Sequence, residues 1–325
     1  MLLEIAIADA YGAGFEFAKP DVLARRPNDF TRYFRHNLDD NLPGMYTDDT
    51  QMSLGLARWL LTVTPQTLSR TQPRDIAWFF VDTFQRDPRQ AYSRRMFNFL
   101  KAHPDVDDFL AAIDPVSTRS GAAMRSAILG VLPTLGDVVR IASMQAKITH
   151  NTPEGIATAV AVSSAAWHVR HGSTIEKAIA AAQVQAIKAA TNCVDRIDPE
   201  KSLEFMEAHN RFWKKTDLSV TPMSPVSYHG VPCVQAAFHA LLTHFDDPIG
   251  MLKAIVSYAG DTDTVAAIAM GIRSMAPGPA IAWPQWCYDT LEKGSWGLDY
   301  LIGIDEKVSV AWPLLETSST SVLSR

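Results

Sequence analysis

Two short acidic segments carry the side chains best suited to chemistry. Their sequences are Tyr46-Thr47-Asp48-Asp49-Thr50 and Gly260-Asp261-Thr262-Asp263-Thr264. Each stands just before a pattern typical of a helix, so the simplest interpretation is helix capping, in which Asp and Thr oxygens accept hydrogen bonds from the first amides. One acid is enough for a cap, however, and two neighbouring acids repel each other unless a cation or solvent screens them. Cation binding is therefore the second interpretation.

Both segments offer only oxygen ligands. In the second segment the acids are two residues apart, so both can face one pocket from a turn, with Thr264 adding an oxygen and Gly260 allowing close approach of the backbone. Hard oxygen ligands without His or Cys suit Mg²⁺, Mn²⁺ or Ca²⁺ rather than zinc. Four carboxylates that converge without a cation would repel one another strongly. The sequence therefore predicts a pair of divalent ions, which could bridge a water molecule or bind substrate oxygens.

The composition excludes several other classes of protein. The 325 residues are 47% hydrophobic and 20% charged, as in ordinary globular proteins. The net charge of −5, without long basic runs, disfavours a nucleic-acid partner. Cys193, Cys233 and Cys287 are scattered, which favours core filling over a disulfide framework or a zinc ribbon. Neither a signal peptide nor an apolar run long enough for a bilayer is present, so we expect a soluble, cytoplasmic protein without a membrane partner.

The chain segments that must position these residues mostly show the hydrophobic spacing of helices, and no convincing strand pattern occurs. We expect one compact all-α domain over residues 1–316, followed by a frayed polar tail at 317–325. Asp49 or Thr50 is the expected cap of the helix at the first acidic segment. The expected helices cover residues 49–61, 75–86, 120–131, 137–146, 152–168, 174–191, 200–214, 232–245, 247–258 and 263–275, with loops at 19–46, 62–75, 103–119 and 216–231.

One helix face in this set has a special composition. Ala157, Ala161 and Ala165 recur every four residues, so a neighbouring helix can approach closely. This pattern is compatible with a dimer seam, but tight packing inside a helical core is the favoured interpretation. A monomer or a weak homodimer is the expected state of the protein.

Four stretches, in the same order as in the family, resemble the ADP-ribosylglycohydrolases, which include the dinitrogenase reductase-activating glycohydrolases. They are Ala8-Asp9-Ala10-Tyr11-Gly12-Ala13-Gly14-Phe15-Glu16-Phe17, Thr47-Asp48-Asp49-Thr50-Gln51-Met52, Ser120-Gly121-Ala122-Ala123-Met124-Arg125 and Gly260-Asp261-Thr262-Asp263-Thr264, with Ile148-Thr149-His150-Asn151 as a looser fifth. The resemblance implies a single-domain orthogonal bundle of helices with two Mg²⁺ or Mn²⁺ ions at the base of a cleft. The metal ligands that it implies are Thr47, Asp48, Asp49, Asp261, Asp263 and Thr264.

The resemblance also implies catalytic roles for Glu16, Asp48 and Asp263. Glu16 falls where relatives carry a glutamate beside the metals, although the sequence alone would favour a solvated acid in a turn. A carboxylate there can orient or deprotonate the water that attacks an anomeric carbon. Asp9 is expected to orient the first loop and to support the site from behind the ligands.

The segment Ser117-Thr118-Arg119-Ser120-Gly121 precedes a helix start, where exposed amides can face an anion, although such a segment is most often just a capped helix. The resemblance implies a cradle there for the diphosphate and ribose of ADP-ribose, made by Ser117, Ser120 and Gly121. Many relatives carry Gly-Asn where Arg119-Ser120 stand. His150 is expected either to contact the distal ribose or phosphate or to be an ordinary loop histidine. Tyr258 is expected either to stack on a base or ribose or to fill the core. For Arg125 a contact with phosphate is one alternative, and the favoured one is that it ties the cradle helix to neighbouring carboxylates.

The function implied is metal-dependent hydrolysis of the glycosidic bond between ADP-ribose and a modified protein side chain, with arginine as the expected acceptor and ADP-ribose as a product. The metals are expected to bind the 2′- and 3′-hydroxyls of the ribose while water attacks its anomeric carbon. Two alternatives remain: hydrolysis of a small-molecule ADP-ribose conjugate or phosphoester, and a non-catalytic ADP-ribose-binding or crystallin-like protein. Residues 19–46 and 103–119 are expected to rim the cleft and to select the acceptor.

Overall fold

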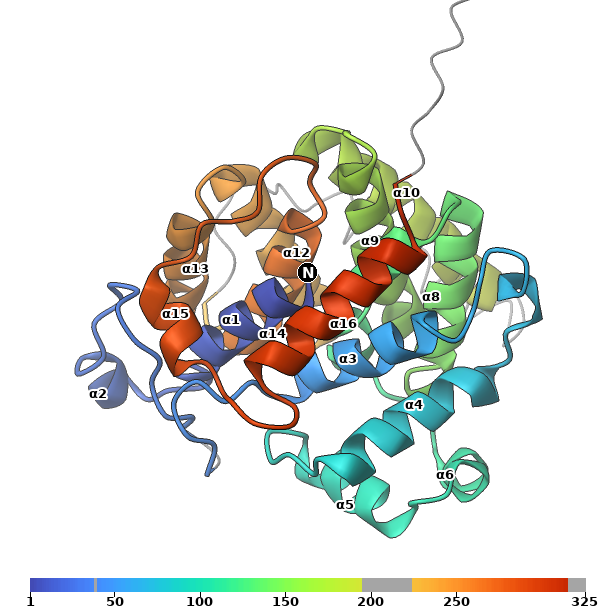
Figure 1. The fold of residues 1–325 in the computed structure, drawn as a ribbon, viewed down its shortest axis with the longest axis horizontal. Helices are drawn as coiled ribbons and strands as arrows, with labels where there is room; N and C mark the ends of the chain where they lie inside the picture. The colour runs from blue at the N-terminus through green and yellow to red at the C-terminus, as the bar shows by residue number, and fades with distance from the viewer. Residues whose placement is uncertain (38–39, 195–223, 315–325) are drawn as a thin grey trace, which may run out of the picture.

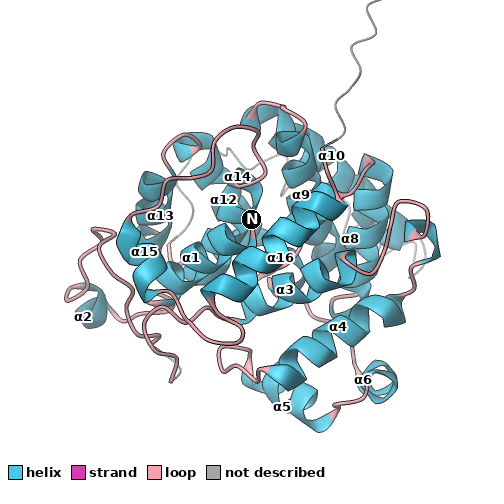
Figure 2. Ribbon diagram, in the orientation of Figure 1, coloured by secondary structure: helices cyan, strands magenta, loops and turns pink. Residues whose placement is uncertain are grey.

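The structure, a computed structural model, describes residues 1–37, 40–194 and 224–314. These residues form helices and loops, with isolated bridges but no β-sheet among them (Figure 2). The expected all-α class is confirmed. In this part of the chain, no helix combines the length and the apolarity needed to cross a membrane. The expected helix 200–214 and tail 317–325, and the side chain of Cys193, lie outside the described residues.

The helices pack against one another as a bundle (Figure 1). They are α1 (Leu2–Ala13), α2 (Pro20–Leu23), α3 (Asp48–Leu60), α4 (Pro73–Arg86), α5 (Arg94–Ala102), α6 (Val106–Ala112), α7 (Gly121–Met124), α8 (Leu135–Thr149), α9 (Pro153–Arg170), α10 (Ile175–Val194), α12 (Gly230–His244), α13 (Pro248–Ser257), α14 (Thr262–Arg273), α15 (Gln285–Thr290) and α16 (Leu298–Ala311), with 3-10 turns η1 (Leu68–Arg70) and η2 (Ala127–Val131).

Helix α1 lies at the centre of the bundle, packed on α14, and α16 crosses over α1 and α3 (Figure 1). Nearly every residue of α1 is buried. At its start, Glu4 accepts a hydrogen bond from the N-terminal amine of Met1. Asp305 on α16 accepts hydrogen bonds from the amides of Leu2 and Leu3, at 2.8 and 3.1 Å. Because α1 is buried on nearly all sides, its sequence shows no clear amphipathic stripe, and the helix was not predicted.

The alanine face of α9 is buried in the core. Ala157, Ala161 and Ala165 are fully buried, and α9 packs against α8, α10 and η2. A Cβ atom added to Gly130 of η2 would lie 2.8 Å from the Cβ of Ala166, which shows how closely the backbones approach. The core interpretation of this face is therefore confirmed, and the dimer seam is not needed to explain it.

Several expected boundaries were wrong. The expected helix 120–131 is divided into α7 and η2, because the chain turns at Arg125, where the buried guanidinium bonds to α8. The expected loop 103–119 contains α6, whose first amides are capped by Asp105. The cap of α3 is Thr47 rather than Asp49 or Thr50. Helices α5, α15 and α16 were not predicted either.

Candidate functional site

One cavity of about 870 Å³ gathers most of the residues singled out in the sequence. Its wall includes Glu16, Asp48, Asp49, Ser117, Ser120, Gly121, His150, Asp261, Asp263 and Thr264. Thr47 and Tyr258 are not among the residues that line it. Thr47 is buried at the start of α3. Tyr258 is buried beside His239, with ring centroids 6.0 Å apart, as in the core alternative.

The acids of the second segment are positioned by the close approach of α1 and α14. A Cβ atom on Gly12 would lie 2.6 Å from the Cα of Asp263, so only a glycine allows this contact. The hydroxyl of Thr262 donates to the carbonyl of Gly12 at 2.8 Å, and the amide of Phe17 donates to the carbonyl of Gly260 at 2.8 Å. These bonds bring Glu16, which follows α1, beside Asp263 at the first turn of α14.

Gly260 makes the turn that directs Asp261 into the cavity. Its φ of 81° lies in the left-handed region, and an added Cβ would lie 1.9 Å from the carbonyl oxygen of Val226. The amide of Asp261 donates to that same oxygen at 3.0 Å. The position of the acid thus depends on a backbone contact that a side chain would break.

Gly260→Ala is therefore expected to lower the free energy of unfolding by more than the roughly 1–3 kcal/mol that a left-handed φ imposes on a non-glycine residue, and also to weaken Mn²⁺ binding. Gly172→Ala is the matched control, because Gly172 has a similar φ of 77° but no atom within 4 Å of an added Cβ. Urea unfolding and metal titration of both variants measure the difference. If Gly260→Ala and Gly172→Ala lose the same free energy of unfolding, the steric argument is refuted.

The acids of the first segment are positioned by Asp9. This residue lies in α1 and is fully buried. Its carboxylate accepts hydrogen bonds from the amides of Thr47 and Thr50, at 2.9 and 3.1 Å, and from the hydroxyl of Thr50 at 2.5 Å. Asp9 thus fixes the start of α3 from outside the cavity wall, and this places Asp48 and Asp49 opposite α14.

Burial raises the pKa of all four carboxylates of the two segments. Burial, followed by the charge of Asp9, raises the pKa of Asp48 and of Asp49 well above the ordinary value. Burial, followed by the charge of Glu16, does the same for Asp263, and burial also raises the pKa of Asp261. Without a compensating cation this cluster favours its protonated form, and a nearby divalent charge would reverse that preference.

The oxygen atoms present fit a hard cation. Asp49 Oδ2 accepts a hydrogen bond from the hydroxyl of Thr47 at 3.2 Å, whereas Asp49 Oδ1 is buried and has no hydrogen-bond partner among the described residues. A buried carboxylate oxygen without a partner is unfavourable. A divalent cation bound by oxygen ligands would satisfy it, and the neighbouring acids would supply the remaining ligands.

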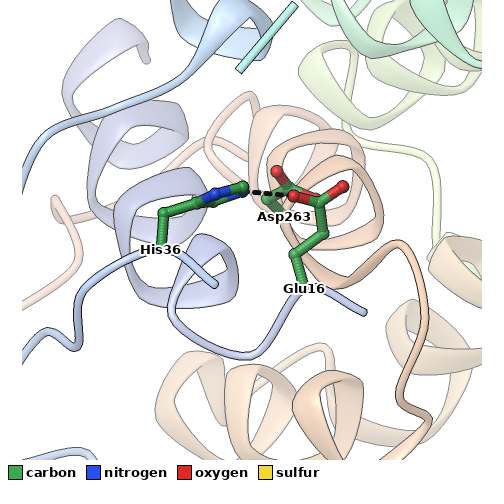
Figure 3. A group of neighbouring side chains, drawn as sticks. All are labelled: Glu16, His36 and Asp263. Atoms are coloured by element: carbon green, nitrogen blue, oxygen red, sulfur yellow. Dashed lines mark hydrogen bonds and ion pairs between the residues drawn. The ribbon is translucent and has the colours of Figure 1, made fainter. Parts of the chain in front are cut away.

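His36 joins the cluster although the sequence analysis did not select it. Its Nε2 atom makes a hydrogen bond with Glu16 Oε2, and one possible ligand atom each from Glu16, His36 and Asp263 lies within 4.8 Å of the others (Figure 3). His36 comes from the irregular segment 19–46, which was expected to rim the cleft. No motif or helical spacing marks it in the sequence, so only the fold brings it to Glu16.

Cys233 is also more than core filling. The thiol is fully buried on α12 and donates to Asp261 Oδ2 at 3.2 Å. Ser120 Oγ donates to the same oxygen at 3.4 Å. These two donors hold Asp261 from the side of α12 and the 117–121 loop. Cys287 is buried, as expected.

The 117–121 loop differs in two ways from the expected anion cradle. Helix α7 has only four residues, and two amides of the loop are already engaged: Arg119 donates to Ser117 Oγ at 3.2 Å, and Ser120 donates to the carbonyl of Tyr228 at 3.1 Å. The guanidinium of Arg125 bonds to Gln145 and Thr149 of α8 rather than to carboxylates, which corrects the expectation for that residue.

His150 lies directly behind this loop. An added Cβ on Gly121 would be 2.9 Å from its Cε1 atom, so the glycine lets the ring reach the cavity wall. Its Nδ1 atom is 2.7 Å from the hydroxyl of Thr149. Burial, followed by the charges of Arg125 and Arg119, lowers the pKa of His150 to about 3. The imidazole is therefore neutral near pH 7, and it can act as a hydrogen-bonding group but not as a charge.

The opposite wall of the cavity was not anticipated. It consists of residues 90–98, which connect α4 to α5 and form the first turns of α5. Of the two segments expected to rim the cleft, 19–46 contributes His36, and 103–119 contributes Ser117 and Arg119. The weak apolar pattern of 90–98 gave no sequence signal for this role.

Comparison with known proteins places this geometry in context. The chain matches the family model described as ADP-ribosylglycohydrolase over residues 1–301. It also resembles a solved structure described as an "ADP-ribosylglycohydrolase-related protein complex", with a TM-score of 0.65 and 20% sequence identity over 96% of this chain and 95% of that chain. At this identity the likeness supports the fold alone. A comparison with curated proteins found no significant match.

Proposed function

Because the chain belongs to the ADP-ribosylglycohydrolase family, whose members are hydrolases that act on ADP-ribose conjugates, we propose that it cleaves the glycosidic bond between ADP-ribose and a modified protein side chain. Arginine is the first candidate for that side chain. The observation that carries the proposal is the convergence of four largely buried carboxylates with Glu16 on the wall of one cavity. Such a cluster suits cation-assisted chemistry on an oxygen-rich substrate.

The ligands proposed for two divalent cations, Mg²⁺ or Mn²⁺, come from both acidic segments. They are Thr47, Asp48, Asp49, Asp261, Asp263 and Thr264. When bound, the cations would neutralise the carboxylates and hold the vicinal hydroxyls of the ribose. The unpartnered Asp49 Oδ1 and the raised pKa values of the acids support this assignment.

Glu16 is proposed as the group that accepts a proton from the attacking water. Its carboxylate lies beside Asp263, and the hydrogen bond from His36 fixes its orientation (Figure 3). Hydrolysis of a ribosyl bond passes through an oxocarbenium-like state, so a correctly placed carboxylate contributes by orienting and deprotonating water. Ser117, Ser120, Gly121 and His150 are proposed to contact the rest of the ADP-ribose, since they line the adjoining wall.

The proposal is tested with peptides that carry ADP-ribose on arginine, serine or glutamate, each incubated with the protein and with Mg²⁺ or Mn²⁺. We expect release of free ADP-ribose from the arginine-linked peptide, and no release when the metals are chelated. Release of inorganic phosphate in place of ADP-ribose would assign phosphoester chemistry. Binding of ADP-ribose without turnover of any peptide would assign a non-catalytic role. Either result would reject the proposed function.

A further inference from the structure

We propose that Arg119, held against Tyr228 on the cavity wall, binds the diphosphate of the ligand and makes the site selective for nucleoside diphosphate sugars over uncharged nucleosides. The inference rests on the proposed function and deepens it.

The backbone around Arg119 is fixed by a second segment. Residues 118–120 pair with 228–230: the amide of Ser120 donates to the carbonyl of Tyr228 at 3.1 Å, and the amide of Gly230 donates to the carbonyl of Thr118 at 3.0 Å. Arg119 and His229 form an isolated antiparallel bridge between these bonds. The attachment point of the arginine side chain therefore does not depend on a ligand.

The side chain of Arg119 is positioned by an aromatic ring. Its Cζ atom lies 4.4 Å from the centroid of the Tyr228 ring, and Phe17 lies beyond, with its ring centroid 6.4 Å from that of Tyr228. A guanidinium stacked on a ring keeps the N–H groups at its edge available, and these match two phosphate oxygens in a fork. The stack thus holds the cation on the wall without using its hydrogen-bond donors.

A side-chain cation at this wall adds a full charge to what the backbone amides can offer an anion. The amides of Arg119 and Ser120 already donate within the protein, and α7 is a single turn. Arg119 is exposed, lines the cavity and forms no ion pair within the described residues.

Arg119 also lies close to the carboxylate cluster, where the ribose is proposed to bind. Ser120, its neighbour in the chain, contacts Asp261 of the carboxylate cluster. The 117–121 loop therefore adjoins the carboxylates, within reach of the 5′-phosphate of a ribose held there. The cavity has two other arginines. Arg125 is buried and engaged by Gln145 and Thr149, and Arg94 belongs to the opposite wall on α5.

Calorimetric titration of the full chain, loaded with Mg²⁺, tests the proposal with ADP-ribose and adenosine as ligands. Arg119→Ala is expected to weaken ADP-ribose binding about tenfold to a hundredfold, as for a lost charge-assisted hydrogen bond, and to leave adenosine binding unchanged. Arg119→Lys should recover part of the affinity. The dependence of the ADP-ribose Kd on salt should become shallower in Arg119→Ala. With an ADP-ribosyl peptide, KM should rise while kcat changes little.

Arg70→Ala is the matched control, since it removes the same charge from an exposed arginine that does not line the cavity, and its Kd for ADP-ribose is expected to match that of the parent protein. The proposal is overturned if Arg119→Ala binds ADP-ribose normally, if it loses ADP-ribose and adenosine affinity equally, or if Arg70→Ala shows the larger loss. Those outcomes leave the proposed function intact when the parent protein still binds and releases ADP-ribose. A parent protein that neither binds ADP-ribose nor releases it from a peptide overturns both proposals.

Discussion

Asp263→Asn is expected to lower ADP-ribosyl hydrolysis by about a thousandfold, a loss typical of removing one strong electrostatic contact from an active site. Asp263 is buried at the first turn of α14 and faces Glu16 and the acids of α3. Its replacement by the isosteric amide keeps the volume but removes a negative charge and a strong oxygen ligand. Steady-state hydrolysis of an ADP-ribosyl peptide in saturating Mn²⁺ measures the loss.

The same variant is expected to be more stable than the parent protein when metals are chelated. In the folded, metal-free parent the pKa of Asp263 is raised, whereas in the unfolded chain it stays near the ordinary value of about 4. The folded state therefore retains protons that the unfolded chain has released, so metal-free stability falls as the pH rises above about 4. Asn cannot ionise. The amount by which the melting temperature of Asp263→Asn exceeds that of the parent protein should therefore be larger at pH 8 than at pH 5.

Asp299→Asn is the control for both measurements, because Asp299 is an exposed acid in the first turn of α16. It should keep full activity and show no comparable gain in stability. If Asp263→Asn hydrolyses the peptide at the parent rate, or if chelation leaves it no more stable than Asp299→Asn, the carboxylate cluster is not the metal site.

Glu16→Gln is expected to lower kcat by about a hundredfold to ten-thousandfold, the usual contribution of a general base, with little change in Mn²⁺ affinity. The amide can still bond to His36, but it cannot accept a proton from water. Kinetics and metal titration on the same preparation separate the two effects. Glu306→Gln, in which an exposed glutamate of α16 is replaced, is the control for the substitution itself.

A parallel loss of Mn²⁺ affinity and activity in Glu16→Gln would contradict the assignment as a base. That result would place Glu16 among the metal ligands, in line with its position in a group with His36 and Asp263 that could hold an ion.

The acidic segments could be predicted from the sequence because their information is local. Two acids and two hydroxyls within five residues predict a hard-oxygen site wherever the fold places them, and residues of both segments line the cavity. The amphipathic helices, such as α3 and α4, could be predicted for the same reason. Their apolar stripes record which face is buried.

The remainder of the site depends on long-range contacts that leave no local pattern. Helix α1 is buried on nearly all sides, and its first amides bond to Asp305, about three hundred residues away in the chain. His36 reaches Glu16 from an irregular segment, and Cys233 reaches Asp261 from α12. Residues 90–98 form a cavity wall only because α5 folds back on α4. None of these contacts produces a sequence pattern from which it could be predicted.

The central claim, that the carboxylate cluster holds the two cations required for hydrolysis, is tested most directly by adding Mn²⁺ back to metal-stripped protein. Bound metal per chain and release of ADP-ribose from an arginine-linked ADP-ribosyl peptide are measured on the same samples. We predict no release by the stripped protein and a rise in activity that levels off at two bound ions per chain. Full turnover by protein that contains no metal would contradict the claim.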